Sequence, residues 1–186
     1  MNKELKKIAK TTLILLEKKS LDSINIDFVF KKAGVNNKNI RKNFDKKIML
    51  LTNINRYIDS RLKDLGKNIE NSNPKDMLFE IIMLRFDVLQ EYRSSIINIF
   101  NYFKQNPKDS LVILPSFLES MILISKLSKI KTNGLKGNLK IKGILIIYLS
   151  TFLVWLKDKG QSMEKTMTSL DQYLEKASKI INIVKT

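Results

Sequence analysis

The sequence predicts an all-α protein of about nine helices, with a small basic head at the N-terminus and a larger helical body. Apolar residues recur at spacings of three and four along the chain, and no stretch shows the sustained period-two alternation that strands require. There are also few clusters of turn-forming residues. With 186 residues, 44% of them hydrophobic, the chain is long enough for one sizeable core.

A helix-turn-helix is expected between Ile24 and Leu50. Asn25 can cap its first helix, and Gly34 can end that helix, because glycine takes the left-handed conformation without strain. Asn36 is expected to cap the second helix, over residues 37–43. The outward side of this second helix would carry amides and cations and no acid: Asn37, Lys38, Arg41 and Lys42. This pattern is typical of a recognition helix that enters the DNA major groove.

The other helix boundaries follow from capping and breaking residues. The tetrapeptide Asn-Pro-Lys-Asp occurs twice, at 73–76 and 106–109, and each copy is a helix-start signal. Pro115 should kink its helix or delay the regular start of that helix. A loop is expected over 132–138, and Ser162 can cap the last helix. The expected helices besides the two already described are 3–19, 46–68, 76–90, 91–105, 108–130, 139–157 and 162–184.

The positive charge is concentrated near the N-terminus. The chain has a formal net charge of +16. Residues 1–63 carry 16 basic and 6 acidic side chains, a net charge of +10, whereas residues 64–186 carry 18 and 12, a net charge of +6. A basic head of this kind favours binding to nucleic acid. The alternative is a compositional bias, because lysine outnumbers arginine 29 to 5, but a bias does not explain the concentration in the head.

Several classes of function are not supported by the composition. The chain has no cysteine and no histidine, which excludes disulfides, the usual zinc ligand sets and all histidine-based catalysis. We find no catalytic constellation, no metal site and no cofactor motif, and we expect that the protein is not an enzyme. The longest uncharged apolar run, 143–156, has 14 residues, whereas a membrane-spanning helix needs about 20. No secretory signal is evident, so a cytoplasmic protein without a transmembrane segment is expected.

The helix-turn-helix resembles that of the TetR-type transcriptional regulators. The residues that match the family's spacing are Val29, Ala33, Gly34, Val35, Ile40, Phe44, Lys47 and Leu50. Three positions depart from the family pattern. Phe30 stands where a small residue is usual, Lys38 where glycine is common, and Arg41 where an aromatic residue is usual.

This resemblance implies a homodimer that binds double-stranded DNA. It places a DNA-binding domain at 1–50 and a domain for ligand binding and dimerisation at 51–186. Asn25 and Lys47 correspond to family positions that touch phosphates. The full set of expected DNA contacts is Asn25, Asn36, Asn37, Lys38, Asn39, Arg41, Lys42 and Lys47. In the family the last two helices pair with those of a partner, which implies an interface containing Ile147, Phe152, Trp155, Met167, Leu170 and Leu174.

The body has two further features that bear on a ligand. Aromatic and methionine residues of the middle helices could line a pocket for a small apolar ligand, or could be ordinary core: Phe86, Phe100, Phe103, Phe117 and Met121. The segment from Trp155 to Asp158, with Thr166-Met167 and Leu170-Asp171, is similar to a bacterial TetR-like subgroup and to the lipid-binding accessory protein of coenzyme Q biosynthesis. The alternative function is therefore a lipid- or isoprenoid-binding accessory protein that shares the TetR-type fold and no longer reads DNA.

Overall fold

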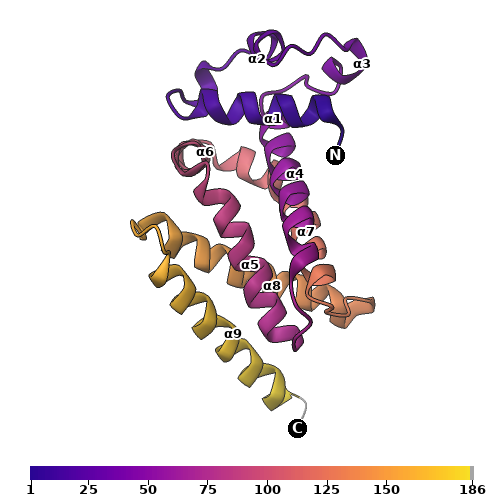
Figure 1. Cartoon of the computed structure of the whole chain (residues 1–186), viewed down its shortest axis with the longest axis vertical. Coiled ribbons are helices and arrows are strands. Elements are labelled where there is room, and N and C mark those ends of the chain that lie inside the picture. The colour runs from indigo at the N-terminus through magenta and orange to yellow at the C-terminus, as the bar shows by residue number, and fades with distance from the viewer. Residues whose placement is uncertain (185–186) are drawn as a thin grey trace. The chain divides into compact units, whose positions relative to one another are not determined.

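The computed structural model describes the backbone of residues 1–184 and the side chains of residues 1–179. The described chain contains nine α-helices and no strand, which confirms the all-α prediction (Figure 1). The helices are α1 (Lys3–Leu16), α2 (Ile26–Ala33), α3 (Lys38–Arg41), α4 (Ile48–Leu65), α5 (Pro74–Gln90), α6 (Arg93–Gln105), α7 (Pro107–Leu127), α8 (Gly134–Lys157) and α9 (Glu164–Val184). Short 3-10 turns lie at Leu21–Ser23 (η1) and Gly66–Asn68 (η2).

The helices form two compact units. Unit one contains Met1–Asp64 and Asp87–Ser120, and unit two contains Leu65–Phe86 and the chain from Met121 onward. Unit one therefore includes the helix-turn-helix together with most of α4, all of α6 and most of α7. The functional division expected at residue 50 stays a prediction, because compactness alone does not assign a role to either segment.

In unit one, α1 is held at its C-terminal end by α6. The last carbonyl groups of a helix have no partner inside the helix and need one elsewhere. Ser95 Oγ donates to the Leu13 carbonyl at 2.7 Å, and Asn98 Nδ2 donates to the Leu16 carbonyl at 2.7 Å. The helix ends at Leu16, three residues earlier than expected, where these side chains of α6 take up its carbonyl groups.

A buried polar cluster joins α4 to α7 within unit one. Asn55 Nδ2 lies 2.9 Å from Ser120 Oγ and 3.0 Å from the Ser116 carbonyl. The Ser120 hydroxyl donates in turn to Asp59 Oδ2 at 2.8 Å. Because buried polar groups are costly unless they are hydrogen-bonded, this cluster fixes the register of the two helices.

Aromatic side chains form the core of unit two. The Phe86 ring stacks on Tyr148 with a centroid distance of 5.5 Å and lies 6.2 Å from Trp155. Trp155 also stacks on Phe152 at 5.4 Å. The buried Arg85 donates from Nε to the Tyr148 hydroxyl at 3.2 Å. Burial of the Phe86, Tyr148 and Trp155 rings against one another removes a large apolar area from water.

A buried aspartate fixes the junction between α8 and α9, which pack against each other. Asp158 Oδ2 accepts hydrogen bonds from the Thr166 amide at 3.0 Å and the Thr166 hydroxyl at 2.9 Å. Thr166 lies in the first turn of α9, so Asp158 caps this helix from eight residues away. The capping role expected for Ser162 was wrong: its hydroxyl donates to Glu164 Oε1 at 3.2 Å.

The loop expected over 132–138 was also wrong, because α8 already begins at Gly134. Gly134 has a positive φ of 68°, which glycine adopts without strain. Gly137 lies inside the helix where a Cβ atom would be 2.0 Å from the Thr132 carbonyl. The two glycines thus allow the chain to turn closely at the start of α8, and neither of them interrupts this helix.

The two Asn-Pro-Lys-Asp copies behave differently. Asn73 Oδ1 accepts from the Lys75 and Asp76 amides at 3.0 Å each, as expected of an N-cap. Asn106 instead donates from Nδ2 to the Tyr102 carbonyl at 3.1 Å. α7 nevertheless begins at Pro107 and continues through Pro115, so the start of this helix is not delayed.

Two of the described helices, α7 and α8, are long and apolar enough to cross a membrane, judged by length and composition alone. Core helices of soluble proteins pass the same test. The expected absence of a transmembrane segment therefore stays a prediction.

Candidate nucleic-acid interface

The helix-turn-helix consists of α2, a turn and α3, which lie on one side of α1 (Figure 1). Asn25 Oδ1 accepts from the Phe28 amide at 3.1 Å, which confirms Asn25 as the cap of α2. Gly34 ends α2 with a φ of 63°, again as expected. Inside the motif the rings of Phe30 and Phe44 meet edge to face at 5.3 Å, and both are buried.

α3 is shorter than expected, and its cap is a different residue. The helix covers only Lys38–Arg41, where residues 37–43 were expected. Its cap is Asn37, whose Oδ1 accepts from the amides of Asn39 at 3.0 Å and Ile40 at 3.3 Å. The capping role expected for Asn36 was therefore wrong by one position.

Polar contacts on both sides hold α3, which has no buried residue. Asn37 Nδ2 donates to Glu4 Oε2 of α1 at 3.2 Å. At the other end, Arg41 Nε donates to Asp27 Oδ1 of α2 at 2.8 Å, and Arg41 Nη1 donates to the Phe44 carbonyl at 2.7 Å. The side chains that fix α3 are thus exposed or partly exposed, in contrast to the buried core that usually fixes a helix.

Two of the three departures from the family pattern are neighbours in space. The Arg41 guanidinium lies over the Phe30 ring, 5.5 Å from its centroid. A guanidinium stacks favourably on an aromatic face. The arginine of α3 and the aromatic ring of α2 therefore form one contact, which accounts for both departures together.

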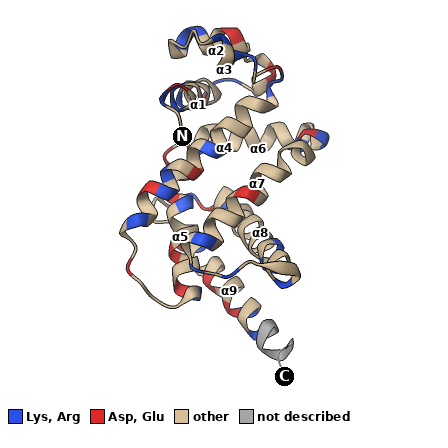
Figure 2. Ribbon diagram, turned by 90° about the vertical axis from the view of Figure 1, so that its right-hand side faces the viewer, with Lys and Arg blue, Asp and Glu red and all other residues tan. Residues whose placement is uncertain are grey.

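The other polar side chains of α3, and that of Lys42, which directly follows this helix, face solvent. Lys38, Asn39 and Lys42 are exposed, and within the described part of the chain their side chains make no hydrogen bond or ion pair. Asn36 is likewise exposed. Figure 2 shows the cations of α2 and α3 in blue. An exposed cluster of ammonium and amide groups can bond to phosphate oxygens and base edges.

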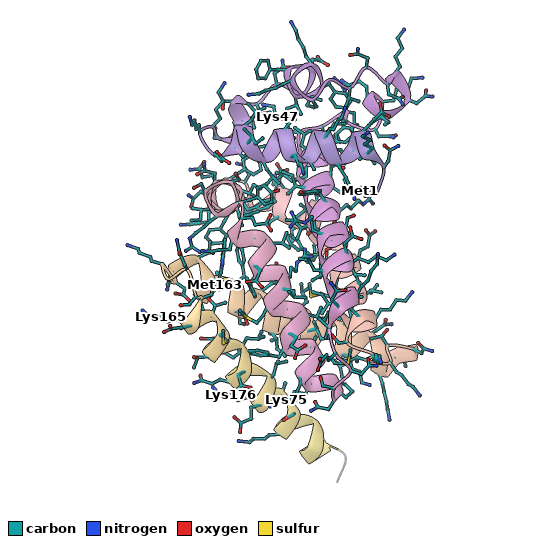
Figure 3. The ribbon with its side chains drawn as sticks, viewed as in Figure 1. Met1, Lys47, Lys75, Met163, Lys165 and Lys176 are labelled. Atoms are coloured by element: carbon teal, nitrogen blue, oxygen red, sulfur yellow. The ribbon has the colours of Figure 1, made fainter. Side chains whose placement is uncertain are left out.

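Asn25 and Lys47, which correspond to phosphate-contacting positions, already have roles within the chain. Asn25 is the cap of α2. Lys47 precedes α4, and its Nζ donates to the Asp22 carbonyl in η1 (Figure 3). Neither role excludes a phosphate contact, because each side chain still lies at or near the surface of the head.

The residues expected at a dimer interface differ in exposure. Three are buried within unit two and belong to its own core: Trp155, Leu170 and Leu174. Ile147 and Phe152 are half-buried, and Met167 is 42% exposed. The most accessible large apolar residues of α8 are others: Leu135, Leu139, Ile146, Leu149 and Leu153. Trp155 is not exposed, because it packs against Phe86. This contact is long-range, and the spacing of residues in the sequence does not reveal it.

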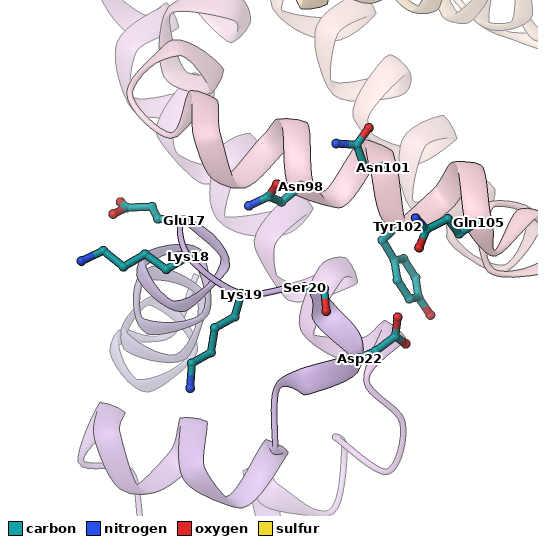
Figure 4. A pocket seen from close by; sticks show the side chains of 9 residues that line it. All are labelled: Glu17, Lys18, Lys19, Ser20, Asp22, Asn98, Asn101, Tyr102 and Gln105. Carbon is teal, nitrogen blue, oxygen red and sulfur yellow. The ribbon is translucent and has the colours of Figure 1, made fainter.

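The residues expected to line a ligand pocket fall in both units. Phe86 and Met121 are buried in unit two, whereas Phe100, Phe103 and Phe117 are half-buried in unit one. None of them lines the described cleft of unit one, which has a volume of about 260 Å³. Polar residues from the end of α1, from η1 and from α6 line this cleft (Figure 4): Glu17, Lys18, Lys19, Ser20, Asp22, Asn98, Asn101, Tyr102 and Gln105.

The polar cleft has no signal in the sequence, because its two halves are about eighty residues apart along the chain. Tyr102 donates to Asp109 Oδ2, and burial together with this hydrogen bond raises the pKa of the Tyr102 hydroxyl. Asn98 is engaged with α1. No group of three acidic, cysteine or histidine residues that could hold a metal ion occurs among the described residues.

The order and packing of these helices define an all-α protein with a TetR-like fold. The chain is similar to the crystal structure of the TetR transcriptional regulator from Nitrosomonas europaea ATCC 19718, with a TM-score of 0.72 and 16% sequence identity. The match covers 95% of this chain and 99% of that one. No protein-family model and no curated protein matches the sequence. At this level of identity the likeness establishes the fold.

Proposed function

We propose that the protein is a DNA-binding transcriptional regulator of the TetR type that acts as a homodimer. The observation that carries this proposal is that Lys38 and Asn39 of α3, and Lys42 directly after it, are all exposed in a helix-turn-helix of a TetR-like fold. The basic head, with a net charge of +10 over residues 1–63, adds attraction for the phosphate backbone.

Each exposed group of α3 matches a chemical feature of duplex DNA. An asparagine side chain can bond bidentately to adenine, and a lysine can bond to guanine or to a phosphate. The short α3 helix would place these groups in the major groove, and the rest of the head would contact the backbone on either side.

Dimerisation would follow from the apolar face of α8. Leu139, Ile146, Leu149 and Leu153 are exposed by 41–72%, and their spacings of seven, three and four residues place them on one side of the helix. Met167 of α9, a helix that packs on α8, is also accessible. Exposed apolar surface of this extent is typical of an interface between subunits.

The dimer can be tested by changing one residue of this face. Ile146→Asp puts a charge into the proposed interface, and we expect the protein to become monomeric in sedimentation equilibrium. The matched control is Leu111→Asp, because Leu111 is similarly exposed, at 69% against 65%, but lies on α7 in unit one. If Ile146→Asp remains dimeric and Leu111→Asp becomes monomeric, the interface does not lie on this face of α8.

The DNA-binding proposal is tested by selecting bound sequences from random duplex DNA with the purified protein. Enrichment of a short inverted repeat is expected of a sequence-specific dimer. For that sequence, Lys42→Ala should reduce the slope of log affinity against log salt by about 0.9 for each phosphate that is no longer neutralised. Lys176→Ala, an exposed lysine of α9 (Figure 3), should leave the slope unchanged. No enrichment from a folded dimer would refute sequence-specific binding.

Two further parts of the proposal depend on this result. A regulator that binds DNA works where the chromosome is, so we place the protein in the cytoplasm. A small apolar ligand of the body is also proposed, as a controller of the distance between the two heads. The segment from Trp155 to Asp158, whose likeness suggested a lipid-binding accessory protein, is accounted for by its structural role at the α8–α9 junction. No observation favours that alternative.

A further inference from the structure

We propose that Arg41 positions α3 and does not itself read DNA, and that base recognition in this helix falls to Lys38 and Asn39. The statement about DNA rests on the proposed function, whereas the statement that Arg41 positions α3 rests only on the contacts of Arg41. Among the cations expected on the outward side of this helix, Arg41 is the one whose side chain is hydrogen-bonded within the head.

The guanidinium of Arg41 is engaged on three sides. Nε donates to Asp27 Oδ1 at 2.8 Å, Nη1 donates to the Phe44 carbonyl at 2.7 Å, and Cζ lies over the Phe30 ring, 5.5 Å from its centroid. The planar fork of arginine can make these contacts simultaneously, which the single ammonium of lysine cannot do. A base contact through Nε or Nη1 would therefore require Arg41 to give up its bond to α2 or to the turn after α3.

α3 needs such an anchor because little else holds it. The helix is four residues long, Ile40 is only half-buried and no other apolar residue lies in it, and short helices are marginal without tertiary contacts. Its N-terminal end is held by Asn37, which bonds to Glu4. Arg41 holds the C-terminal end, so the two contacts together fix the direction in which Lys38, Asn39 and Lys42 point.

The two possible roles of Arg41 predict opposite effects of Asp27→Asn. If Arg41 reads DNA, this change releases the guanidinium from a competing acid, and affinity rises. If Arg41 positions α3, the same change weakens the anchor, and affinity falls by about fivefold per head, or about 25-fold for a dimer with two heads. Asp45→Asn removes another exposed acid of the same head and measures the general effect of removing one negative charge.

The experiment measures DNA affinity of Asp27→Asn, Arg41→Ala, Arg41→Lys and the double variant Asp27→Asn/Arg41→Ala against salt, with Asp45→Asn as reference. We expect a lower affinity for Asp27→Asn and for Arg41→Ala, a double variant no weaker than Arg41→Ala, and no rescue of affinity in Arg41→Lys. The salt slope and the selected base sequence should stay as in the wild type. In contrast, Lys38→Ala and Asn39→Ala should change the selected sequence.

An affinity of Asp27→Asn above that of Asp45→Asn would overturn the proposal. So would a lower salt slope or a changed base preference in Arg41→Ala. A readout without DNA separates this proposal from the proposed function: hydrogen exchange of the Lys42, Asn43 and Phe44 amides, which close the turns of α3. Faster exchange in Asp27→Asn, with α2 unchanged, supports the anchor even if no operator exists, and unchanged exchange refutes it.

Discussion

The helix-turn-helix and the α8–α9 junction each contain one aspartate that bonds across two segments, but the two aspartates lie in opposite environments. Asp27 pairs with Arg41, and 77% of its side chain is exposed. Asp158 is only 4% exposed and accepts hydrogen bonds from the backbone and the hydroxyl of Thr166. One contact is an ion pair in water, and the other is a buried cap.

This difference indicates how firmly each region is held. Exposed ion pairs contribute about 1 kcal/mol or less and weaken with salt. A buried hydrogen-bonded carboxylate costs more to remove, because its donors are then left without a partner. The contact that holds α3 in the head is therefore the weaker one, and the contact that holds the α8–α9 junction is the stronger one.

Among the variants that test this contrast, Phe86→Ala should have the largest effect on stability. The ring is fully buried against Tyr148 and Trp155, so the free energy of unfolding should fall by about 3–5 kcal/mol. Phe28→Ala, in α2 of the head, removes a ring that is 49% exposed and should cost about 1 kcal/mol or less. Urea unfolding of both variants measures the difference, and equal costs would contradict the contrast.

Asp158→Ala should cost about 2–3 kcal/mol, because it leaves the Thr166 amide and hydroxyl without their acceptor. Burial would raise the pKa of this carboxyl, but its hydrogen bonds to Thr166 and to the Gly160 amide outweigh burial and hold the pKa below its usual value. The contribution of Asp158 to the free energy of unfolding is therefore complete above the ordinary aspartate pKa of about 3.9. It is lost as the pH falls through the lower pKa that this carboxyl has in the folded protein.

The pH dependence gives the check on this prediction. The gap in stability between the wild type and Asp158→Ala should be constant near neutral pH and should narrow only in acid. A gap that closes between pH 7 and pH 5 would show that another group is responsible.

Gly137→Ala and Gly143→Ala form a matched pair within α8. A Cβ atom at Gly137 would overlap the Thr132 backbone, so the entry to α8 must shift, at a cost of about 1–3 kcal/mol. Nothing lies within 4 Å of a Cβ atom at Gly143, and alanine there should stabilise the helix by about 0.5–1 kcal/mol. Thermal unfolding should show shifts of opposite sign, and shifts of the same sign would refute the close approach.

The smallest effect is expected for Asp27→Asn on overall stability, about 1 kcal/mol or less at low salt. High salt should reduce the effect further, since the pair is exposed. Thermal unfolding at two salt concentrations measures it. An effect as large as that of Asp158→Ala, or one insensitive to salt, would remove the distinction between the two aspartates.

Local signals in the sequence predicted much of the fold. Asn25, Gly34 and Asn73 mark helix ends through contacts with residues two to four positions away, and each acts as expected. The periodicity of apolar residues predicted the nine helices of the described chain. Such features are readable because their partners are close in sequence.

The predictions were wrong or incomplete where the partner of a residue is distant in sequence, or where two adjacent residues could both cap the same helix. Asn36 and Asn37 are equally good caps in sequence, and only the path of the turn selects Asn37. Gly137 falls in the loop expected over 132–138, although it lies inside α8, where the close approach of the Thr132 backbone leaves no room for a Cβ atom. The contacts of Arg41 with Asp27 and of Asp158 with Thr166 span fourteen and eight residues, beyond any local pattern.

The burial of Trp155 has a practical consequence for following this protein in solution. It is the only tryptophan of the chain, and it lies in the core of unit two, stacked on Phe152. Its fluorescence therefore reports on that unit and is silent about the head. Comparing tryptophan emission with circular dichroism, which sees every helix, would show directly whether the two units melt together.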